Sequence, residues 1–287
     1  MGEYGRMVAR KEGLSPQVAV RDVLVHPSLD LALVFARNLG FDGVELSVGG
    51  PRLREHPIWS RQGVSALAAE RERTRIRFLS VRLESRRVRG LLAEDPTLRE
   101  ATQKLIAGLI SRAAALRADV VTLPLPLPDD LKEDQQKELI VYFRDLGDLA
   151  ARYGPRVALS FSRRWEPGLQ VLDAVSSPAL GAELDVVAAA RARRPVEQLA
   201  EELGPRLVQV RMRDLNAEGE ICSLGSGVVN LIPLFETLYR RAFQGYCIVD
   251  APPGPDPVAT AAANLAHVRE LIQTAYQMLE GPESPEE

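Results

Sequence analysis

Cysteine, histidine and tryptophan are scarce in this sequence: 287 residues contain two cysteines, three histidines and two tryptophans. Cys222 and Cys247 are far apart and form no C-x-x-C motif, so we expect neither a disulfide scaffold nor a structural zinc site. The histidines His26, His56 and His267 are equally scattered and supply no set of metal ligands. Two isolated cysteines suit a reducing compartment, and a cytoplasmic location is therefore expected.

An excess of basic charge and a long apolar run are both missing. The 36 basic and 39 acidic residues give a formal net charge of -3, which provides no basic field for a nucleic acid backbone. No segment approaches the roughly 18 apolar residues of a membrane helix, and residues 1–17 contain no apolar run of signal-peptide length. We expect neither nucleic acid nor a membrane as a partner.

The common catalytic motifs are also absent. The sequence has no Gly-x-Ser-x-Gly elbow, no phosphate-binding Walker loop and no His-Glu-x-x-His helix, so nucleophilic catalysis has no candidate residue. A doubly wound dinucleotide-binding sheet usually has a glycine-rich turn after its first strand. Here the corresponding residues, 25–28, read Val-His-Pro-Ser and contain no glycine.

What the sequence does contain is a regular alternation of short β-type runs and longer helical runs. Hydrophobic residues make up 46% of the chain, enough for one large core, and the length is ordinary for an α/β barrel of about 250 residues. A parallel sheet with crossover helices requires this alternation. We predict eight strands, over 18–25, 43–47, 76–83, 119–123, 156–161, 181–186, 206–212 and 246–250.

Capping residues and prolines indicate the helix boundaries. Ser28 is predicted to open the first helix and Gly40 to end it, while Asp95 is predicted to cap a helix over 95–117. A further helix is predicted over 133–153. The apolar face of helix 95–117 is expected to consist of Leu98, Ala101, Leu105, Leu109, Ala113 and Leu116. Later helices are predicted near Pro167, Pro195, Asn230 and Asp256.

These elements together predict an α/β fold, a single (β/α)8 TIM barrel over residues 18–279. Residues 1–17 are expected to form a flexible N-terminal segment. Residues 280–287 are rich in proline and glutamate, and we expect them to be a disordered acidic tail.

Several segments resemble the xylose isomerase-like barrel superfamily. The clearest is 32–46, Ala-Leu-Val-Phe-Ala-Arg-Asn-Leu-Gly-Phe-Asp-Gly-Val-Glu-Leu, a helix, tight turn and strand of a form that these proteins use repeatedly. Segments 180–185, 207–214, 223–227 and 245–250 are also similar and occur in the order that the superfamily has. The resemblance implies sugar isomerase or epimerase activity. The endonuclease members are a poorer model, because they need a histidine-rich three-metal cluster.

The resemblance also implies where a metal would be held. Active members bind a divalent metal through a glutamate, an aspartate, a histidine and a glutamate on strands five to eight, and manganese, magnesium, cobalt or zinc suits such ligands. In this sequence the four positions are Ser160, Asp185, Arg211 and Asp250. Since a guanidinium has no free lone pair, Asp185 and Asp250 are the residual candidate ligands. The resemblance therefore implies a degenerate metal site, and we predict no cofactor.

The register of the superfamily implies which side chains point into the mouth of the barrel. They are Glu45, Arg82, Glu84, Ser160, Glu183, Asp185, Gln209, Arg211, Arg213 and Asp250. Two explanations of this set stay open. In the first, Arg211 pairs with Asp185 and Asp250 and neutralises carboxylates left over from a metal site. In the second, Arg82, Arg211 and Arg213 form a pocket that recognises a phosphate or carboxylate.

Three neighbouring features also have two interpretations each. The loop 216–227 is either part of a phosphate site or a turn that leads into the helix near Asn230. Arg163-Arg164-Trp165 either covers the mouth or belongs to a solvated loop. His26 either shuttles a proton or makes a local hydrogen bond at a helix start.

The sequence thus predicts a sugar isomerase or epimerase-like barrel that binds a small sugar, polyol or sugar phosphate. If catalysis persists, Asp185, Asp250 or Glu183 acts as the base, and Arg211 stabilises an enediolate-type oxyanion. The residues predicted to contact the ligand are Glu45, Arg82, Glu84, Ser160, Gln209 and Arg213. The alternative is a non-catalytic barrel, a pseudoenzyme that senses a ligand or binds a partner. A homodimer is an open alternative.

Overall fold

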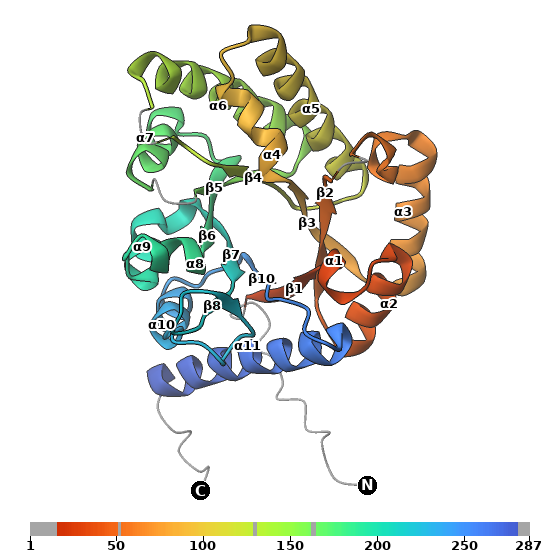
Figure 1. Cartoon of the computed structure of the whole chain (residues 1–287), viewed down its shortest axis with the longest axis vertical. Coiled ribbons are helices and arrows are strands. Elements are labelled where there is room, and N and C mark those ends of the chain that lie inside the picture. The colour runs from red at the N-terminus through yellow and green to blue at the C-terminus, as the bar shows by residue number, and fades with distance from the viewer. Residues whose placement is uncertain (1–15, 51–52, 129–130, 162–164, 281–287) are drawn as a thin grey trace, which may run out of the picture.

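Eight parallel strands close into a barrel that is surrounded by helices (Figure 1). The structure is a computed structural model, and it describes residues 16–50, 53–128, 131–161 and 165–280. The order of the strands around the barrel is β1-β10-β7-β6-β5-β4-β3-β2. Their bounds are β1 Gln17–Arg21, β2 Gly43–Val48, β3 Arg77–Leu83, β4 Val120–Leu125, β5 Arg156–Phe161, β6 Leu180–Asp185, β7 Leu207–Met212 and β10 Tyr246–Val249. The predicted single (β/α)8 barrel is confirmed.

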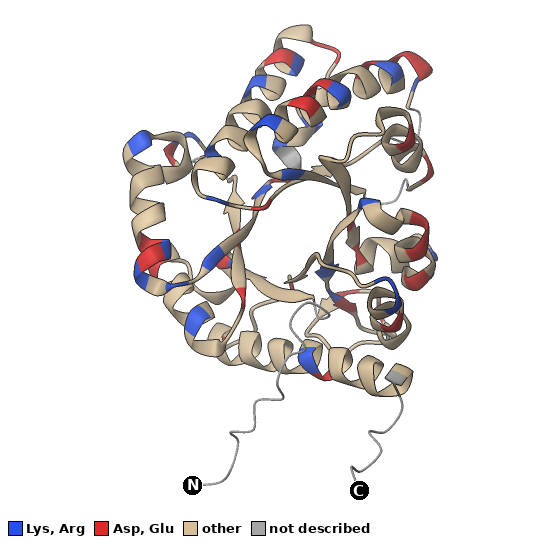
Figure 2. Cartoon of the chain, turned by 180° about the vertical axis from the view of Figure 1, so that it is seen from behind, with Lys and Arg blue, Asp and Glu red and all other residues tan. Residues whose placement is uncertain are grey.

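The helices fill the crossovers between successive strands. Their bounds are α1 Asp22–Val25, α2 Leu29–Leu39, α3 Arg61–Thr74, α4 Ser85–Val88, α5 Pro96–Ala115, α6 Glu133–Tyr153, α7 Trp165–Val175, α8 Val186–Arg191, α9 Val196–Leu203, α10 Ile232–Arg240 and α11 Pro257–Glu280. Helix α11 packs against α10, α1 and α2, so the last helix closes the outer ring beside the first ones (Figure 1). Charged residues of both signs are spread over the outer helices (Figure 2).

The predicted helix ends at Gly40 and Asp95 are confirmed, and Ser28 is at the N-cap of α2 but makes no capping hydrogen bond with its side chain. Gly40 ends α2 in the left-handed conformation, with φ of 90°, and glycine adopts this conformation without steric cost. Asp95 caps α5, because its side chain accepts a hydrogen bond from Thr97 N at 2.9 Å. Helix α6 has the bounds that its pattern predicts. Local sequence therefore determines most helix ends in this chain.

The first predicted strand, 18–25, is too long. Strand β1 ends at Arg21, and the short helix α1 begins at Asp22. The carboxylate of Asp22 accepts hydrogen bonds from its own neighbour, Val23 N, at 2.9 Å and from Ser47 N at 3.1 Å. A short acidic side chain that binds nearby backbone in this way turns the chain out of the strand.

The apolar face predicted for α5 is also partly wrong. Leu98 is 49% exposed and Ala101 is exposed, whereas Leu109 and Ala113 of the predicted face are buried. The buried residues of α5 are Thr102, Ile106, Leu109, Ile110 and Ala113. Thr102 lies directly against Gly90, where a Cβ would meet its hydroxyl oxygen at 2.0 Å. This contact buries Thr102 against the turn η3 (Arg89–Leu92), and the periodicity of apolar residues could not identify a threonine as part of the buried face.

Both ends of the chain and three short internal segments lie outside the described residues. Our expectation for residues 1–17 falls on residues that are not described, except at the last two, which the structure describes. The expectation for 280–287 likewise falls on residues that are not described, apart from Glu280. None of the helices within the described ranges combines the length and apolarity needed to cross a lipid bilayer.

Candidate functional site

Polar side chains line the barrel interior toward the C-terminal ends of the strands, the end that we call the mouth. Glu183 of β6 pairs in register with Gln209 of β7, and Asp185 pairs with Arg211. Residues two apart on a strand share a face, so these pairs lie in successive layers. Glu45, Glu183, Gln209 and Arg211 are each 0% exposed. The upper part of the barrel interior is therefore a buried charged network rather than an apolar core.

Arg211 is the centre of this network. Its Nε donates to Glu183 Oε1 at 3.0 Å and its Nη2 donates to Glu183 Oε2 at 2.8 Å, which makes a bidentate pair. Nη2 also donates to Glu45 Oε1 at 2.7 Å, and Nη1 donates to Asp250 Oδ2 at 2.9 Å. One guanidinium thus connects carboxylates from β2, from β6 and from the residue after β10.

Two further arginines bind the same carboxylates from the solvent side. Arg82 Nη1 donates to Glu183 Oε1 at 2.9 Å. Arg21 Nη1 donates to Asp250 Oδ1 at 3.1 Å. The side chains of Arg82 and Arg21 are 12% and 19% exposed, so both reach the surface of the mouth.

Arg213 is the fourth arginine of the network. Its Nε donates to Asp250 Oδ2 at 2.9 Å, and its Nη1 lies 3.3 Å from Asp185 Oδ2. The other oxygen of Asp185 caps α8, because it accepts hydrogen bonds from Val187 N at 3.0 Å and Ala188 N at 3.2 Å. The side chain of Arg213 is 21% exposed. Asp185 is therefore held between a helix N-terminus and an arginine.

The pairing that we expected for Arg211 is partly wrong. Arg211 does bind Asp250, but its other carboxylate partners are Glu183 and Glu45 and not Asp185. The physical reason is the role of Asp185 as the cap of α8, which turns its carboxylate toward the helix and toward Arg213.

A layer of neutral polar groups lies below the charges. Gln209 Nε2 donates to Thr122 Oγ1 at 2.9 Å and to Glu183 Oε2 at 2.5 Å. Ser80 donates to Glu45 Oε2 at 3.1 Å and lies 2.9 Å from Thr122 Oγ1. Within the described part of the chain, Gln209 Oε1 is buried without a hydrogen-bond partner. The layer supports the carboxylates from below and separates them from the apolar lower part of the barrel.

The network is electrically balanced. It contains four arginines, Arg21, Arg82, Arg211 and Arg213, and four carboxylates, Glu45, Glu183, Asp185 and Asp250.

The positive charges decide the ionisation of the central groups. Burial alone would raise the pKa of Glu183, but the charges of Arg211 and Arg82 outweigh it and hold the pKa well below its usual value. Burial would also raise the pKa of Asp250, but the charges of the neighbouring arginines outweigh burial and lower it. For Arg211, burial would lower the pKa, but the surrounding carboxylates raise it well above the ordinary value. All three groups are therefore charged at neutral pH.

The remaining predicted site residues fall in different places. Ser160 is buried and hydrogen-bonds the side chain of Glu183, so it belongs to the network. Glu84 instead lies over the loop that follows β2, where its Oε2 accepts a hydrogen bond from Gly50 N at 2.7 Å. A Cβ on Gly49 would overlap the Glu84 side chain. Loop packing therefore accounts for the position of Glu84.

Sequence reasoning missed three members of the site: Arg21, Ser80 and Thr122. Arg21 was overlooked because the first strand was predicted to continue to residue 25, so that its polar end was not recognised. Ser80 precedes Arg82 by two residues, and the alternation of strand side chains places both on one face. Thr122 occupies the corresponding level of β4, as its pairing with Arg82 shows. This alternation was the available signal for Ser80 and Thr122.

Asp22 is a further buried carboxyl group near the mouth. It is 5% exposed, and its Oδ1 accepts hydrogen bonds from Val23 N and Ser47 N. Ser47 Oγ in turn accepts a hydrogen bond from Arg21 Nε at 3.3 Å. Burial raises the pKa of Asp22 to about 6, and the hydrogen bonds from Ser47 and Val23 oppose that shift.

The glycine-containing loop after β7 is organised around Asp214. Its carboxylate accepts hydrogen bonds from Gly225 N at 3.1 Å, Gly227 N at 3.0 Å and Val229 N at 3.2 Å. The small strands β8 (Asp214–Leu215) and β9 (Ile221–Cys222) pair antiparallel at the base of this loop, a hairpin that we did not predict. Since Asp214 already occupies these N–H groups, the interpretation of 216–227 as a turn is favoured over a phosphate site.

Two other ambiguous features have structural explanations. His26 Nδ1 lies 3.0 Å from Ser28 N and accepts its hydrogen bond, which is the local role at a helix start. Trp165 is completely buried in α7, with its ring edge-on to Phe161 at a centroid distance of 5.8 Å. The residues Arg163 and Arg164 lie outside the described ranges. Trp165 is thus a core residue rather than part of a solvated loop.

A family model described as "Xylose isomerase-like TIM barrel" matches residues 33–271. No curated protein matches the chain significantly.

Many solved structures share the fold. A xylose isomerase domain protein from Alicyclobacillus acidocaldarius subsp. acidocaldarius is 20% identical, with a TM-score of 0.74, and the match covers 91% of this chain and 100% of the other. An L-ribulose 3-epimerase is 13% identical, with a TM-score of 0.79 and coverage of 95% and 100%. A 3-keto-D-glucoside 4-epimerase from E. coli is 17% identical, with a TM-score of 0.75 and coverage of 89% and 100%.

Proposed function

The chain belongs to the xylose isomerase-like TIM barrel family, and from this membership we propose that it is a metal-independent member which binds a small neutral sugar or polyol at the barrel mouth. One observation carries the proposal: Arg211, completely buried, binds the carboxylates of Glu45, Glu183 and Asp250 at once. A fixed cation that contacts three carboxylates occupies the electrostatic role that a divalent ion has in a carboxylate site.

The donor set does not fit the divalent metal of related proteins. Metal ligands need free lone pairs directed at a common point, and here the oxygens of Glu183 and Asp250 are directed at guanidinium N–H groups. Arg211 and Ser160 also stand where the resemblance implies a histidine and a glutamate. In the described part of the chain, no group of three or more His, Cys, Asp or Glu is arranged to hold a metal ion.

The same contacts favour binding over proton transfer by Glu183 and Asp250, two of the three residues that we predicted as bases. A general base works best when its pKa is near the working pH, whereas the pKa values of Glu183 and Asp250 are both lowered. Arg211 is 0% exposed and donates to three carboxylates, so it is enclosed by them and does not face the space that a substrate oxyanion would occupy. These contacts therefore support a barrel that binds its ligand without catalysing a reaction.

The ligand class follows from the charge balance of the mouth. Four arginines face four carboxylates, so an added phosphate or carboxylate would find no unbalanced positive charge. Hydroxyl groups are different, because they donate to carboxylates and accept from arginines without changing the total charge. The partly exposed side chains of Arg21, Arg82 and Arg213 are the groups that such a ligand would meet first.

Calorimetric titration with a neutral ketohexose, a linear polyol and a hexose phosphate tests this proposal. We expect the neutral compounds to bind and the phosphate to bind at least tenfold more weakly, and we expect Arg82→Gln to weaken the neutral ligand by about tenfold, or 1.4 kcal/mol. Arg77→Gln is the matched control, because Arg77 lies at the opposite end of the same strand and pairs with Asp119. Binding of none of the neutral compounds, or equal effects of the two substitutions, would refute the proposal.

A further inference from the structure

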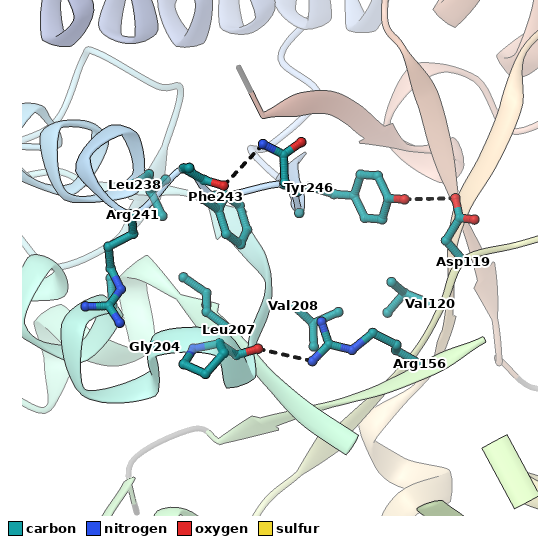
Figure 3. A pocket seen from close by; sticks show the side chains of 15 residues that line it. Asp119, Val120, Arg156, Gly204, Leu207, Val208, Leu238, Arg241, Phe243 and Tyr246 are labelled. Carbon is teal, nitrogen blue, oxygen red and sulfur yellow. Dashed lines mark hydrogen bonds between the residues drawn. The ribbon is translucent and has the colours of Figure 1, made fainter. Parts of the chain in front are cut away.

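A cavity of about 390 Å³ lies at the end of the barrel opposite the mouth, and Figure 3 shows the side chains that line it. Four strands, β4, β5, β7 and β10, begin at this cavity. Their first residues, Val120, Arg156, Leu207 and Tyr246, all line it. Its volume is within the range of small-molecule sites. This end of such barrels ordinarily serves stability, so an open cavity there needs a separate explanation.

Arg156 is the first charged group of the cavity. Its guanidinium points from β5 toward the 3-10 turn η4 (Gly204–Arg206), where Nη2 donates to Pro205 O at a long 3.3 Å (Figure 3). Its Nε is shielded from solvent and has no hydrogen-bond partner among the described residues. Within the same ranges no carboxylate pairs with Arg156, and burial lowers its pKa. The charge of Arg156 is therefore only weakly compensated by the protein.

Arg241 is the second charged group, and it reaches the same turn from the end of α10. A Cβ on Gly204 would lie 2.9 Å from Arg241 Nη2, so this nitrogen is next to the turn whose following carbonyl binds Arg156. Arg241 is exposed, and no carboxylate of the described chain forms an ion pair with it. Two guanidinium groups without carboxylate partners thus flank the Gly204–Pro205 segment.

The rest of the cavity wall is mostly apolar. Phe243, Leu238, Leu207 and Val208 lie between and beside the two arginines (Figure 3).

The cavity also contains a carboxylate, that of Asp119, but its charge is already compensated. Asp119 Oδ2 accepts hydrogen bonds from Arg77 Nη2 at 2.7 Å and from the hydroxyl of Tyr246 at 2.9 Å. The balance of the lining is therefore positive, with an apolar surface between the charges.

We propose that this cavity binds a small organic oxyanion, with its phosphate or carboxylate group held by Arg156, its apolar body against Phe243 and Leu238, and Arg241 adding positive charge from the other side of the cavity. Guanidinium groups bind planar or tetrahedral oxyanions through paired N–H donors, and an anion here would supply the charge that Arg156 lacks. The site is separate from the mouth, since its residues start the strands whose other ends carry the arginine network. The proposal of an oxyanion site therefore does not depend on whether the mouth binds a sugar.

Titration calorimetry with phenyl phosphate, inorganic phosphate, benzoate and phenol tests the site on the full chain. We expect phenyl phosphate to bind more tightly than inorganic phosphate and phenol not to bind detectably. Benzoate reports whether a carboxylate can replace the phosphate group. We expect Arg156→Gln to weaken phenyl phosphate binding at least tenfold and Arg241→Gln to weaken it several-fold.

Matched variants separate this site from other positive groups. Arg152→Gln and Arg240→Gln remove charges close in sequence to Arg156 and Arg241 but outside the cavity, and they should change the affinity less than twofold. Arg213→Gln removes a charge from the mouth and should also leave the affinity of the cavity for phenyl phosphate unchanged. Without ligand, Arg156→Gln should unfold at the same or a higher temperature than the parent protein, which shows that the variant is folded. Absence of binding by phenyl phosphate and benzoate, or loss of binding in Arg213→Gln but not in Arg156→Gln, would overturn the proposal.

Discussion

Replacement of Arg211 by methionine should destabilise the protein strongly. It should also make the stability increase, and not decrease, as the pH falls from about 7 to about 5. The substitution keeps an unbranched side chain of similar length but removes the guanidinium that binds Glu45, Glu183 and Asp250. Breaking one buried ion pair by removing a partner costs about 3–5 kcal/mol. Since Glu45 and Glu183 are 0% exposed, we expect a loss at the upper end of this range at pH 7.

The pH dependence follows from the same contacts. In the parent protein the pKa values of Glu183 and Asp250 are lowered, so their stabilising effect is present above the unfolded-state pKa values of about 4 and is lost as the pH falls below them. The Arg211→Met variant lacks the largest positive charge effect that opposes burial at Glu183, so burial raises the pKa of Glu183. The folded variant then binds more protons than the unfolded chain, and its stability should increase as the pH falls from about 7 to about 5.

Urea unfolding at several pH values measures both effects. A globular domain has a total stability of about 5–15 kcal/mol, so the predicted loss is a large part of it and shifts the urea midpoint clearly. Arg152→Met is a suitable control, because Arg152 is exposed on α6 and makes one hydrogen bond to a backbone oxygen. A loss below about 1 kcal/mol, with the parent's pH dependence unchanged, would show that Arg211 does not hold the carboxylates together.

Two further predictions concern groups near the mouth. Asp22 has a pKa raised to about 6, so the folded protein retains a proton that the unfolded chain releases near pH 4, and stability falls as the pH rises between these values. Asp22→Asn should therefore be more stable than the parent by on the order of 2 kcal/mol at pH 8 and nearly equal to it at pH 4, measured by urea unfolding; an equal difference at both pH values would contradict this. Gly227→Ala should lower stability by about 1–3 kcal/mol in the same assay, because its Cβ would lie 2.2 Å from Asp214 Oδ1. A loss below about 0.5 kcal/mol would show that the contact with Asp214 does not matter.

The fold could be predicted from the sequence because its signals are local. Eight strand patterns, each followed by a helical pattern, define a barrel regardless of small errors at their ends. The errors occurred where a side chain contacted a distant part of the chain. The carboxylate of Asp22 ends β1 by binding Ser47, and Thr102 of α5 is buried against Gly90 of the preceding turn.

The site could be predicted only in its composition. The resemblance identified most of the polar residues, because a shared register fixes which positions of a strand face inward. It could not identify the partner of each charge, since Arg211 reaches carboxylates on β2, on β6 and just after β10, and the carboxylate of Asp185 instead caps α8. Ion pairs of this kind depend on side-chain rotamers across the barrel, which no local pattern encodes.

The cavity near Arg156 had no sequence signal at all. Arg156 and Arg241 are 85 positions apart, and each is an ordinary arginine at the boundary of a helix or strand. Their relation depends on the turn at Gly204, which both approach. Such a site becomes visible when the described residues are placed in space.

Equilibrium dialysis against Mn²⁺ tests most directly the central claim that Arg211 takes the place of a metal. The account predicts that the parent protein takes up no stoichiometric Mn²⁺, and that the double variant Ser160→Glu, Arg211→His, which restores the two ligand types implied by the resemblance, takes up about one ion per chain. Circular dichroism spectra that coincide with the parent's would establish that the variant is folded. Stoichiometric Mn²⁺ uptake by the parent protein would contradict the account.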